Sequence, residues 1–224
     1  DCLVFTRYFN GRLQFYSVDR SFLNSSVYHI KMETFESSHV SKKKNTHVDL
    51  PGDIPQADLV KRFIRVNHAG EFGAKRIYEG QLAVLKDTQE AATIEHMKDQ
   101  ELHHLETFEK LIVDRQVRPT IFHPIWNVAG FALGVGTALL GPKAAMACTV
   151  AVEEVIDEHY ADQVAQLTED EKDLKETIHR FREEALEHRD TAIDLGGETT
   201  PGYPVLRKAI RAGSKLAIWL SERF

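Results

Sequence analysis

The feature that most constrains this fold is a set of long helical repeats whose apolar face carries acids and imidazoles. From 58 to 85 apolar side chains recur about every 3.6 residues, as in an α-helix, and Glu71 lies on the apolar line. The same period over 88–115 puts Glu101 and His104 on an apolar line. Burying carboxylates without a counter-charge costs many kcal/mol. We therefore expect these helices to pack around a charged interior.

Prolines and glycines divide the rest of the chain. A Pro-Gly-Asp-Ile-Pro segment at 51–55 marks the start of the helical part. A third helix is predicted over 142–167, where a proline is tolerated in the first turn. A fourth is predicted over 168–195, with Thr168 as its N-cap and two glycines after its end, and a last helix ends near 223. The chain therefore reads as four long helices and one accessory helix.

An uncharged run rich in glycine and alanine covers 125–141. A stretch of 17 residues is near the lower limit for a membrane span, and its glycines favour a buried hairpin or a segment lying in the lipid interface instead. The spacing of Gly130 and Gly134 is a weak helix-packing signal, because small residues recur by chance in such a run.

Composition limits the remaining possibilities. A chain of 224 residues with 42% hydrophobic residues suits one folded domain with extensions. We assign that domain to 58–224, and residues 1–57 to an unstructured or presequence-like extension. Residues 1–47 hold seven Lys or Arg, four acids and many Ser, Phe and Tyr, a bias of mitochondrial presequences that a disordered tail would share.

Charge and cysteine content exclude two classes of protein. The net charge of −6 and a pI near 6.0 speak against nucleic acid as a partner, because phosphate binding needs clustered Lys and Arg. Cys2 and Cys148 are far apart in unlike contexts, so neither a disulfide framework nor a thiolate metal site is predicted. A reducing compartment fits best.

The acids and imidazoles follow a metal-ligand pattern. Glu101 and His104 share one helix face, and Glu71 approaches from the antiparallel neighbour. Glu153 and His188 repeat this spacing in the second half. Two helices giving one Glu each and two giving Glu-x-x-His is the ligand pattern of ferritin-like di-iron and di-manganese proteins. Oxygen and imidazole donors favour iron or manganese over zinc, and redox chemistry favours iron. The competing interpretation is a hydrogen-bonded polar core.

Several motifs in order carry a family resemblance. They are Val66–Ala74, Ile77–Gln81, Asp99–His104, Arg118-Pro119, Pro124–Trp126, Gly136–Leu140, Ala144–Glu154 and Ala217–Arg223. Over roughly 58–224 the chain resembles the demethoxyubiquinone hydroxylases of ubiquinone biosynthesis. The resemblance implies an all-α, ferritin-like four-helix bundle with an apolar mid-chain hairpin or crossover and an extra C-terminal amphipathic helix. By the motif match, Glu71, Glu101, His104, Glu153 and His188 are ligands of two iron ions.

The resemblance also implies an activity and its setting. The activity would be that of a di-iron monooxygenase, which uses dioxygen to hydroxylate the ring of a polyprenyl methoxy-benzoquinol, demethoxyubiquinol, in the penultimate step of ubiquinone biosynthesis. NADH is implied as ultimate electron donor, although no Gly-x-Gly-x-x-Gly stretch follows a predicted strand here. The implied location is the matrix side of the mitochondrial inner membrane, as a peripheral protein. Expected partners are a lipid-binding protein of the biosynthetic complex and further copies of the chain.

One position departs from the family pattern. The family has Glu-Leu-Glu-His before the last ligand, whereas this chain has Ala185-Leu-Glu-His188, so the sixth ligand is missing. Glu184, four residues before His188, lies near the same helix face, about 100 degrees round the helix from position 185, and is a candidate substitute. An alternative is a weakened paralogue that serves as a quinone-binding assembly subunit. Iron storage is disfavoured by the apolar 125–141 run.

Three further residues lie near the predicted ligands in sequence, and none of them is assigned a part in the chemistry. Tyr160 follows Glu153 by about two turns, and core filling is favoured over electron relay. His159 precedes it, and no role is assigned. Asp190 could orient an imidazole, but a solvated helix face is favoured.

Overall fold

The computed structural model describes residues 2–9, 12–19 and 54–224. Strands β1 (Cys2–Phe9) and β2 (Arg12–Asp19) form an antiparallel hairpin in which Cys2 pairs with Asp19. Periodicity did not predict this hairpin. The expected presequence-like character of 1–57 stays a prediction, because residues 1, 10–11 and 20–53 lie outside the described residues.

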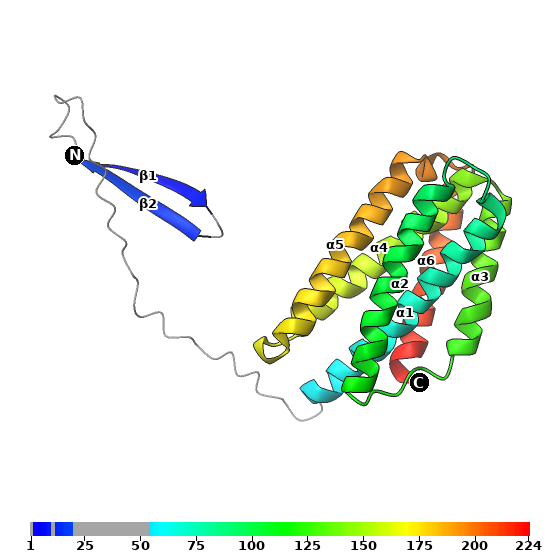
Figure 1. Cartoon of the computed structure of the whole chain (residues 1–224), viewed down its shortest axis with the longest axis horizontal. Helices are drawn as coiled ribbons and strands as arrows, with labels where there is room; N and C mark the ends of the chain where they lie inside the picture. The colour runs from blue at the N-terminus through cyan, green and yellow to red at the C-terminus, as the bar shows by residue number, and fades with distance from the viewer. Residues whose placement is uncertain (1, 10–11, 20–53) are drawn as a thin grey trace. The chain divides into compact units, whose positions relative to one another are not determined.

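A helical unit follows from residue 54 (Figure 1). Its six α-helices are α1 (Gln56–Leu85), α2 (Ala91–Asp114), α3 (His123–Leu139), α4 (Pro142–Gln166), α5 (Lys172–Asp194) and α6 (Tyr203–Arg223). Helix α1 packs against α2 and α4 packs against α5, while α3 lies along α1 and α6 along α4. This arrangement confirms the predicted all-helical bundle. The apolar segment, for which a hairpin was one possibility, forms the single helix α3.

Glycine and proline set the helix ends at two junctions. Gly141, with φ of 111°, makes the turn from α3 into α4, which begins at Pro142. Gly196, with φ of 85°, follows the end of α5, as expected. Thr168, predicted to be the N-cap of the fourth helix, has the N-cap position of a short turn before α5, but its side chain makes no cap hydrogen bond. A 3₁₀ turn, η2 (Glu169–Glu171), precedes α5, and it closes on the Thr168 carbonyl, whose side chain caps nothing.

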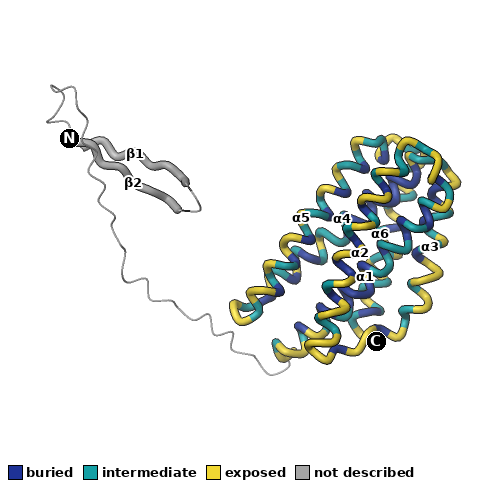
Figure 2. Tube along the Cα trace, in the orientation of Figure 1, coloured by how far each residue is buried: buried dark blue, intermediate teal, exposed yellow. Residues whose placement is uncertain are grey.

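The core consists of apolar layers with a polar layer between them. One cluster gathers around Phe108, Ile178 and Phe181, and another around Met97 and Met146. In sequence, the predicted ligands fall between these apolar positions on each helix. Figure 2 shows the buried inner faces of the bundle and the exposed outer faces of its helices. The bundle therefore holds its charged groups in a dry interior.

Glycines let α3 approach α1 closely. A Cβ atom added to Gly134 would lie 2.0 Å from the Ile77 carbonyl oxygen, and one added to Gly80 would lie 2.3 Å from the Phe131 carbonyl oxygen. The weak signal at Gly130 and Gly134 therefore marks a real helix contact. Across the described residues, none of the helices combines the length and apolarity needed to cross a bilayer.

Candidate metal centre

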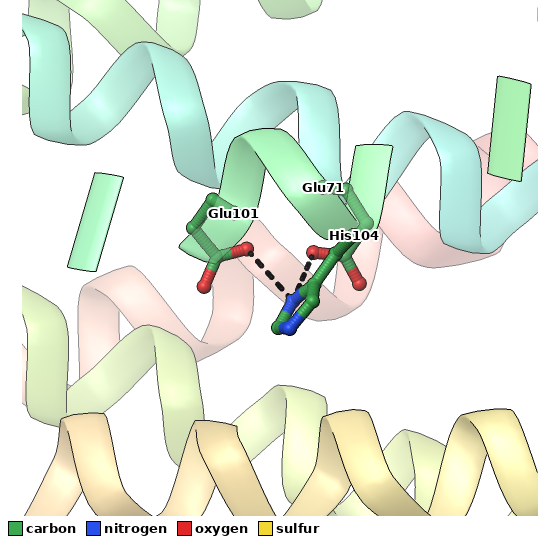
Figure 3. A group of neighbouring side chains, drawn as sticks. All are labelled: Glu71, Glu101 and His104. Atoms are coloured by element: carbon green, nitrogen blue, oxygen red, sulfur yellow. Dashed lines mark ion pairs between the residues drawn. The ribbon is translucent and has the colours of Figure 1, made fainter. Parts of the chain in front are cut away.

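The five predicted ligands come together inside the bundle. Glu71 comes from α1, Glu101 and His104 from α2, Glu153 from α4 and His188 from α5, and each is at most 2% exposed. They form two groups, within each of which the candidate ligand atoms lie within 4.8 Å of one another. Figure 3 shows the first group, in which Glu71 and Glu101 both approach the His104 ring.

Glu101 belongs to both groups, which spacing along the chain did not reveal. His104 Nδ1 lies 3.4 Å from Glu71 Oε2 and 3.7 Å from Glu101 Oε2. On the other side, His188 Nδ1 lies 3.1 Å from Glu101 Oε1 and 3.6 Å from Glu153 Oε1. The two oxygens of Glu101 thus face different imidazoles. Each half of the site has two carboxylates and one imidazole, with Glu101 shared.

Two buried tyrosines donate hydrogen bonds to carboxylates of the site. Tyr78 donates a hydrogen bond to Glu153 Oε1 at 2.7 Å, and Tyr160 donates one to Glu71 Oε1. Each tyrosine follows one carboxylate by seven residues and bonds the other. Tyr160 is buried in the core as predicted, but it also bonds a site carboxylate. Tyr78 was missed, although its spacing from Glu71 matches that of Tyr160 from Glu153.

The electrostatics of the cluster suit a bound cation. Burial raises the pKa of Glu71 to about 8, and the neighbouring Glu101 carboxylate adds to that rise. Burial lowers the pKa of His104 and His188, but their carboxylate neighbours outweigh burial and raise those pKa values to about 11 and about 10. In the absence of metal, protons on the imidazoles therefore offset the buried carboxylates.

Unpaired atoms test whether a metal fits. Glu101 Oε2, Glu153 Oε2 and His188 Nδ1 are buried without a hydrogen-bond partner. Buried polar atoms are seldom left unpaired, because each costs about 1–3 kcal/mol. Glu153 and His188 belong to the second group, and Glu101 belongs to both. Oxygen and imidazole donors left free in a dry interior are what a divalent iron or manganese ion would use.

The position of the missing ligand is filled by the buried Ala185, which is 3% exposed. Glu184, the candidate substitute, lies elsewhere: its Oε2 is 2.6 Å from His104 Nε2, the ring nitrogen opposite the cluster. It belongs to neither group. Gln100 Oε1 lies 3.0 Å from His188 Nε2 in the same way. Asp190 is 62% exposed and pairs with Arg189, so it lies on a solvated face as expected.

A cavity of about 540 Å³ adjoins one side of the site. It is lined by residues of α1, α3, α4 and α6, most of them apolar. Its polar residues near the cluster include Asn67, Glu71, His159 and Tyr160. Gln163 bonds both Asn67, at 2.8 Å, and His159 Nε2, at 2.6 Å, which fixes these side chains. The cavity is therefore an apolar space that reaches the site at Glu71.

Residues 58–221 match the protein family described as "Ubiquinone biosynthesis protein COQ7". The chain belongs to the COQ7 family. It is 56% identical over 186 residues to "3-demethoxyubiquinol 3-hydroxylase" of Rhodospirillum rubrum, covering 83% of this chain and 88% of the relative.

Further COQ7 relatives are mitochondrial. The human "NADPH-dependent 3-demethoxyubiquinone 3-hydroxylase, mitochondrial" is 53% identical over 168 residues, covering 73% of this chain and 77% of the relative. The yeast "5-demethoxyubiquinone hydroxylase, mitochondrial" from Saccharomyces cerevisiae is 39% identical over 212 residues, covering 84% and 90%. The human protein's name specifies NADPH, whereas the resemblance led us to expect NADH.

Proposed function

We propose that this chain hydroxylates the ring of demethoxyubiquinol, a polyprenyl methoxy-benzoquinol, with dioxygen at a two-iron centre in ubiquinone biosynthesis. The observation that carries this proposal is a buried pair of Glu/His groups sharing Glu101 beside an apolar cavity. Membership of the COQ7 family and the names of its relatives support the same reaction. The activity would make the chain a monooxygenase.

In this proposal, Glu71, Glu101 and His104 hold one iron, and Glu101, Glu153 and His188 hold the other. When bound, the iron pair supplies the redox chemistry that activates dioxygen. Glu101 would serve both positions, because one of its oxygens faces His104 and the other faces His188. The apolar layers keep bulk water from the centre, which strengthens every charge interaction there.

The tyrosines hold protons next to the carboxylates. Tyr160 keeps its phenolic proton, because burial and the carboxylate of Glu71 raise its pKa well above the usual value. Its hydroxyl therefore donates to Glu71 and orients that carboxylate. Tyr78 does the same for Glu153 from the other side. Of the two, Tyr160 lines the large cavity, so it faces the side on which the quinol ring would lie.

The cavity supports the choice of a polyprenyl substrate. Its apolar walls suit an isoprenoid tail, and Asn67 and His159 offer polar contacts for ring oxygens. Burial lowers the pKa of His159 to about 4, so its imidazole is neutral at the pH of the mitochondrial matrix. A neutral ring donates or accepts a hydrogen bond without adding charge to the cavity.

The electron donor remains part of the proposal. The names of several relatives specify NADPH, and we propose a reduced nicotinamide, NADPH before NADH, as the ultimate donor. No dinucleotide-binding Gly-x-Gly-x-x-Gly motif follows a strand in the chain. Electrons would therefore come through the quinol, a small carrier or a separate protein.

The proposed location is the matrix side of the mitochondrial inner membrane, as a peripheral protein. Large apolar side chains are exposed on α3 and α6, among them Ile125, Val128, Val205, Leu216 and Trp219. Such a surface suits reversible docking on lipid and contact with a lipid-binding partner of the biosynthetic complex or with further copies of the chain. The mitochondrial relatives are consistent with this location.

A second candidate is a quinone-binding assembly subunit with weakened turnover. It is favoured by Ala185, which leaves no carboxylate three residues before His188. An assembly subunit would bind the quinol in the cavity without oxidising it. Turnover separates the two candidates.

The test is hydroxylation by the purified, iron-loaded chain with a short-chain demethoxyubiquinol and isotopically labelled dioxygen. We expect one labelled oxygen atom in the product when either nicotinamide and a small electron carrier are supplied. Glu153→Gln should abolish labelling, whereas Glu158→Gln, on an exposed part of the same helix, should not. Quinol binding without any labelled product, in the presence of bound iron, would favour the assembly subunit.

A further inference from the structure

The imidazoles of His104 and His188 each make a hydrogen bond through Nε2, the ring nitrogen that points away from the cluster, and the two partners differ. Glu184 accepts a hydrogen bond from His104 Nε2 at 2.6 Å, and Gln100 accepts one from His188 Nε2 at 3.0 Å. Gln100 immediately precedes Glu101 on α2, and Glu184 immediately precedes Ala185 on α5. Each helix therefore supports the histidine of the other. The halves match in geometry but not in charge.

Both contacts fix the same form of the ring. A carboxylate oxygen and an amide oxygen only accept, so Nε2 carries the proton in both rings. In a neutral imidazole this leaves the Nδ1 lone pair free, and Nδ1 is the atom that faces the cluster in both histidines. The partners thus prepare both rings to bind metal through Nδ1.

The partners differ in how far they polarise the ring. Glu184 is a carboxylate, 24% exposed, and it draws the Nε2 proton of His104 toward a negative charge. That makes Nδ1 of His104 a stronger donor to a cation. Gln100 offers only a neutral amide to His188. The missing carboxylate at Ala185 would weaken the second position in the same direction, so the effect of the supporting partners has to be measured by changing Glu184 and Gln100 themselves.

We propose that Glu184 is a positioning residue for His104, and that the Glu184/Gln100 difference makes the Glu71–Glu101–His104 position bind metal more tightly than the Glu101–Glu153–His188 position. The proposal rests on the two-metal centre of the proposed function. It also gives Glu184 a role other than the missing sixth ligand. A residue bonded to Nε2 lies on the side of the ring opposite Nδ1, and Nδ1 faces the cluster, so Glu184 would not be a direct ligand while it holds the ring.

The test is an anaerobic titration with Co²⁺, followed by calorimetry and by the visible spectrum of the bound ion. Co²⁺ accepts the same oxygen and imidazole donors as Fe²⁺ without reacting with oxygen as readily. The variants are Glu184→Gln, which keeps the hydrogen bond but removes the charge, and Gln100→Glu, which adds a charge behind His188. Glu183→Gln, 65% exposed on the same helix, is the control for lost charge. Glu71→Gln, which removes a ligand of one position only, assigns the two binding steps.

We expect two binding steps in the unmodified chain, the tighter one lost in Glu71→Gln. Glu184→Gln should weaken the tighter step by about 10–100-fold and leave the weaker step unchanged. Gln100→Glu should strengthen the weaker step by about 10-fold, and Glu183→Gln should move neither. Circular dichroism of each metal-free variant checks that the helices are intact.

Three outcomes would overturn the inference. If Glu184→Gln leaves the tighter step unchanged, the charge behind His104 has no effect on binding. If it removes the weaker step instead, Glu184 is a ligand of the second position. If the unmodified chain binds no Co²⁺ at all, the two-metal centre itself fails, and the proposed function with it.

Discussion

The close approach of α3 and α1 makes a sharp prediction about Gly134. In Gly134→Ala, the new Cβ would lie 2.0 Å from the Ile77 carbonyl oxygen and 3.0 Å from the Gln81 amide nitrogen. Carbon and oxygen atoms in contact lie about 3.3 Å apart or more. Helix α3 would therefore have to move away from α1 by about 1 Å. Both obstructing atoms belong to the backbone, so no side chain can turn aside.

The cost follows from packing and propensity. Overpacking of this kind destabilises by about 1–3 kcal/mol, whereas replacing glycine by alanine in a helix gains at most about 1 kcal/mol. Gly136 lies in the same helix, where an added Cβ meets no atom within 4 Å, so Gly136→Ala provides the matched control. We expect Gly136→Ala to equal or exceed the parent in stability, and Gly134→Ala to be less stable than Gly136→Ala by about 2–3 kcal/mol.

Urea unfolding followed by far-UV circular dichroism measures both variants. Gly134→Ala should lower the midpoint with the slope unchanged, since a change in stability alone leaves the surface exposed on unfolding the same. If Gly134→Ala and Gly136→Ala unfold at the same midpoint, the glycine contact does not hold α3 against α1, and this account of the crossover is wrong.

Three further predictions concern the site and its surroundings. Burial lowers the pKa of His159 from 6.5 to about 4. Between these two pH values the His159 imidazole is therefore protonated in the unfolded chain but neutral in the folded chain. The free energy of unfolding should therefore fall by about 2 kcal/mol as the pH drops from 6.5 to about 4, a value reduced because the ring is only half-buried. In His159→Gln, urea titrations should show a smaller fall over the same pH range. An unchanged pH dependence in this variant would contradict the assignment to His159. Ala185→Glu should retain more iron after dialysis and turn over faster than the unmodified chain, and equal values for both would show that the missing carboxylate is not needed. Trp219→Ser should weaken liposome binding by about 10-fold, because burial of a large apolar side chain contributes about 1.5–3 kcal/mol. Val113→Ser, on α2, is the control and should bind liposomes as the unmodified chain does. Equal binding of the two variants would exclude α6 from the docking surface.

The sequence predicts the helices of the bundle well because their inner faces alternate with polar outer faces. The period places Glu71, Glu101 and Glu153 on buried lines, and Glu-x-x-His spacing identifies His104. Helix α3 lacks this contrast, because most of its residues are apolar, and so periodicity left a membrane span, a buried hairpin and an interfacial segment open. What decided its form is the contact of its glycines with α1, which is a tertiary feature.

The finer arrangement of the site depends on atoms that spacing does not locate. Glu101 reaches both halves because one of its oxygens faces His104 of α2 and the other faces His188 of α5, and a helical wheel gives only the direction of the side chain. Glu184 lies about 100 degrees from Ala185 round the helix, which is compatible with a ligand and with a support for the ring. Only the distance to His104 Nε2 distinguishes the two roles.

The start of α5 was also predicted imprecisely. Thr168 has the residue type of an N-cap and acids after it, but its carbonyl rather than its hydroxyl closes the turn. The backbone angles of Thr168 are those of an N-cap, but its side chain makes no hydrogen bond to the turn, and residue type does not show whether that bond forms. The boundary of α5 therefore fell a few residues later than predicted.

The measurement that tests the central claim most directly is the iron content of the chain and of one variant. The chain is loaded with Fe²⁺ without oxygen, freed of unbound metal, and analysed for iron per chain and for the Mössbauer spectrum of that iron. We predict two ions at saturation, and loss of both in Glu101→Gln, because that carboxylate faces both imidazoles. Glu106→Gln, exposed on the same helix, should keep both. Retention of a full iron complement by Glu101→Gln, or no iron in the unmodified chain, would contradict a two-metal centre built around Glu101.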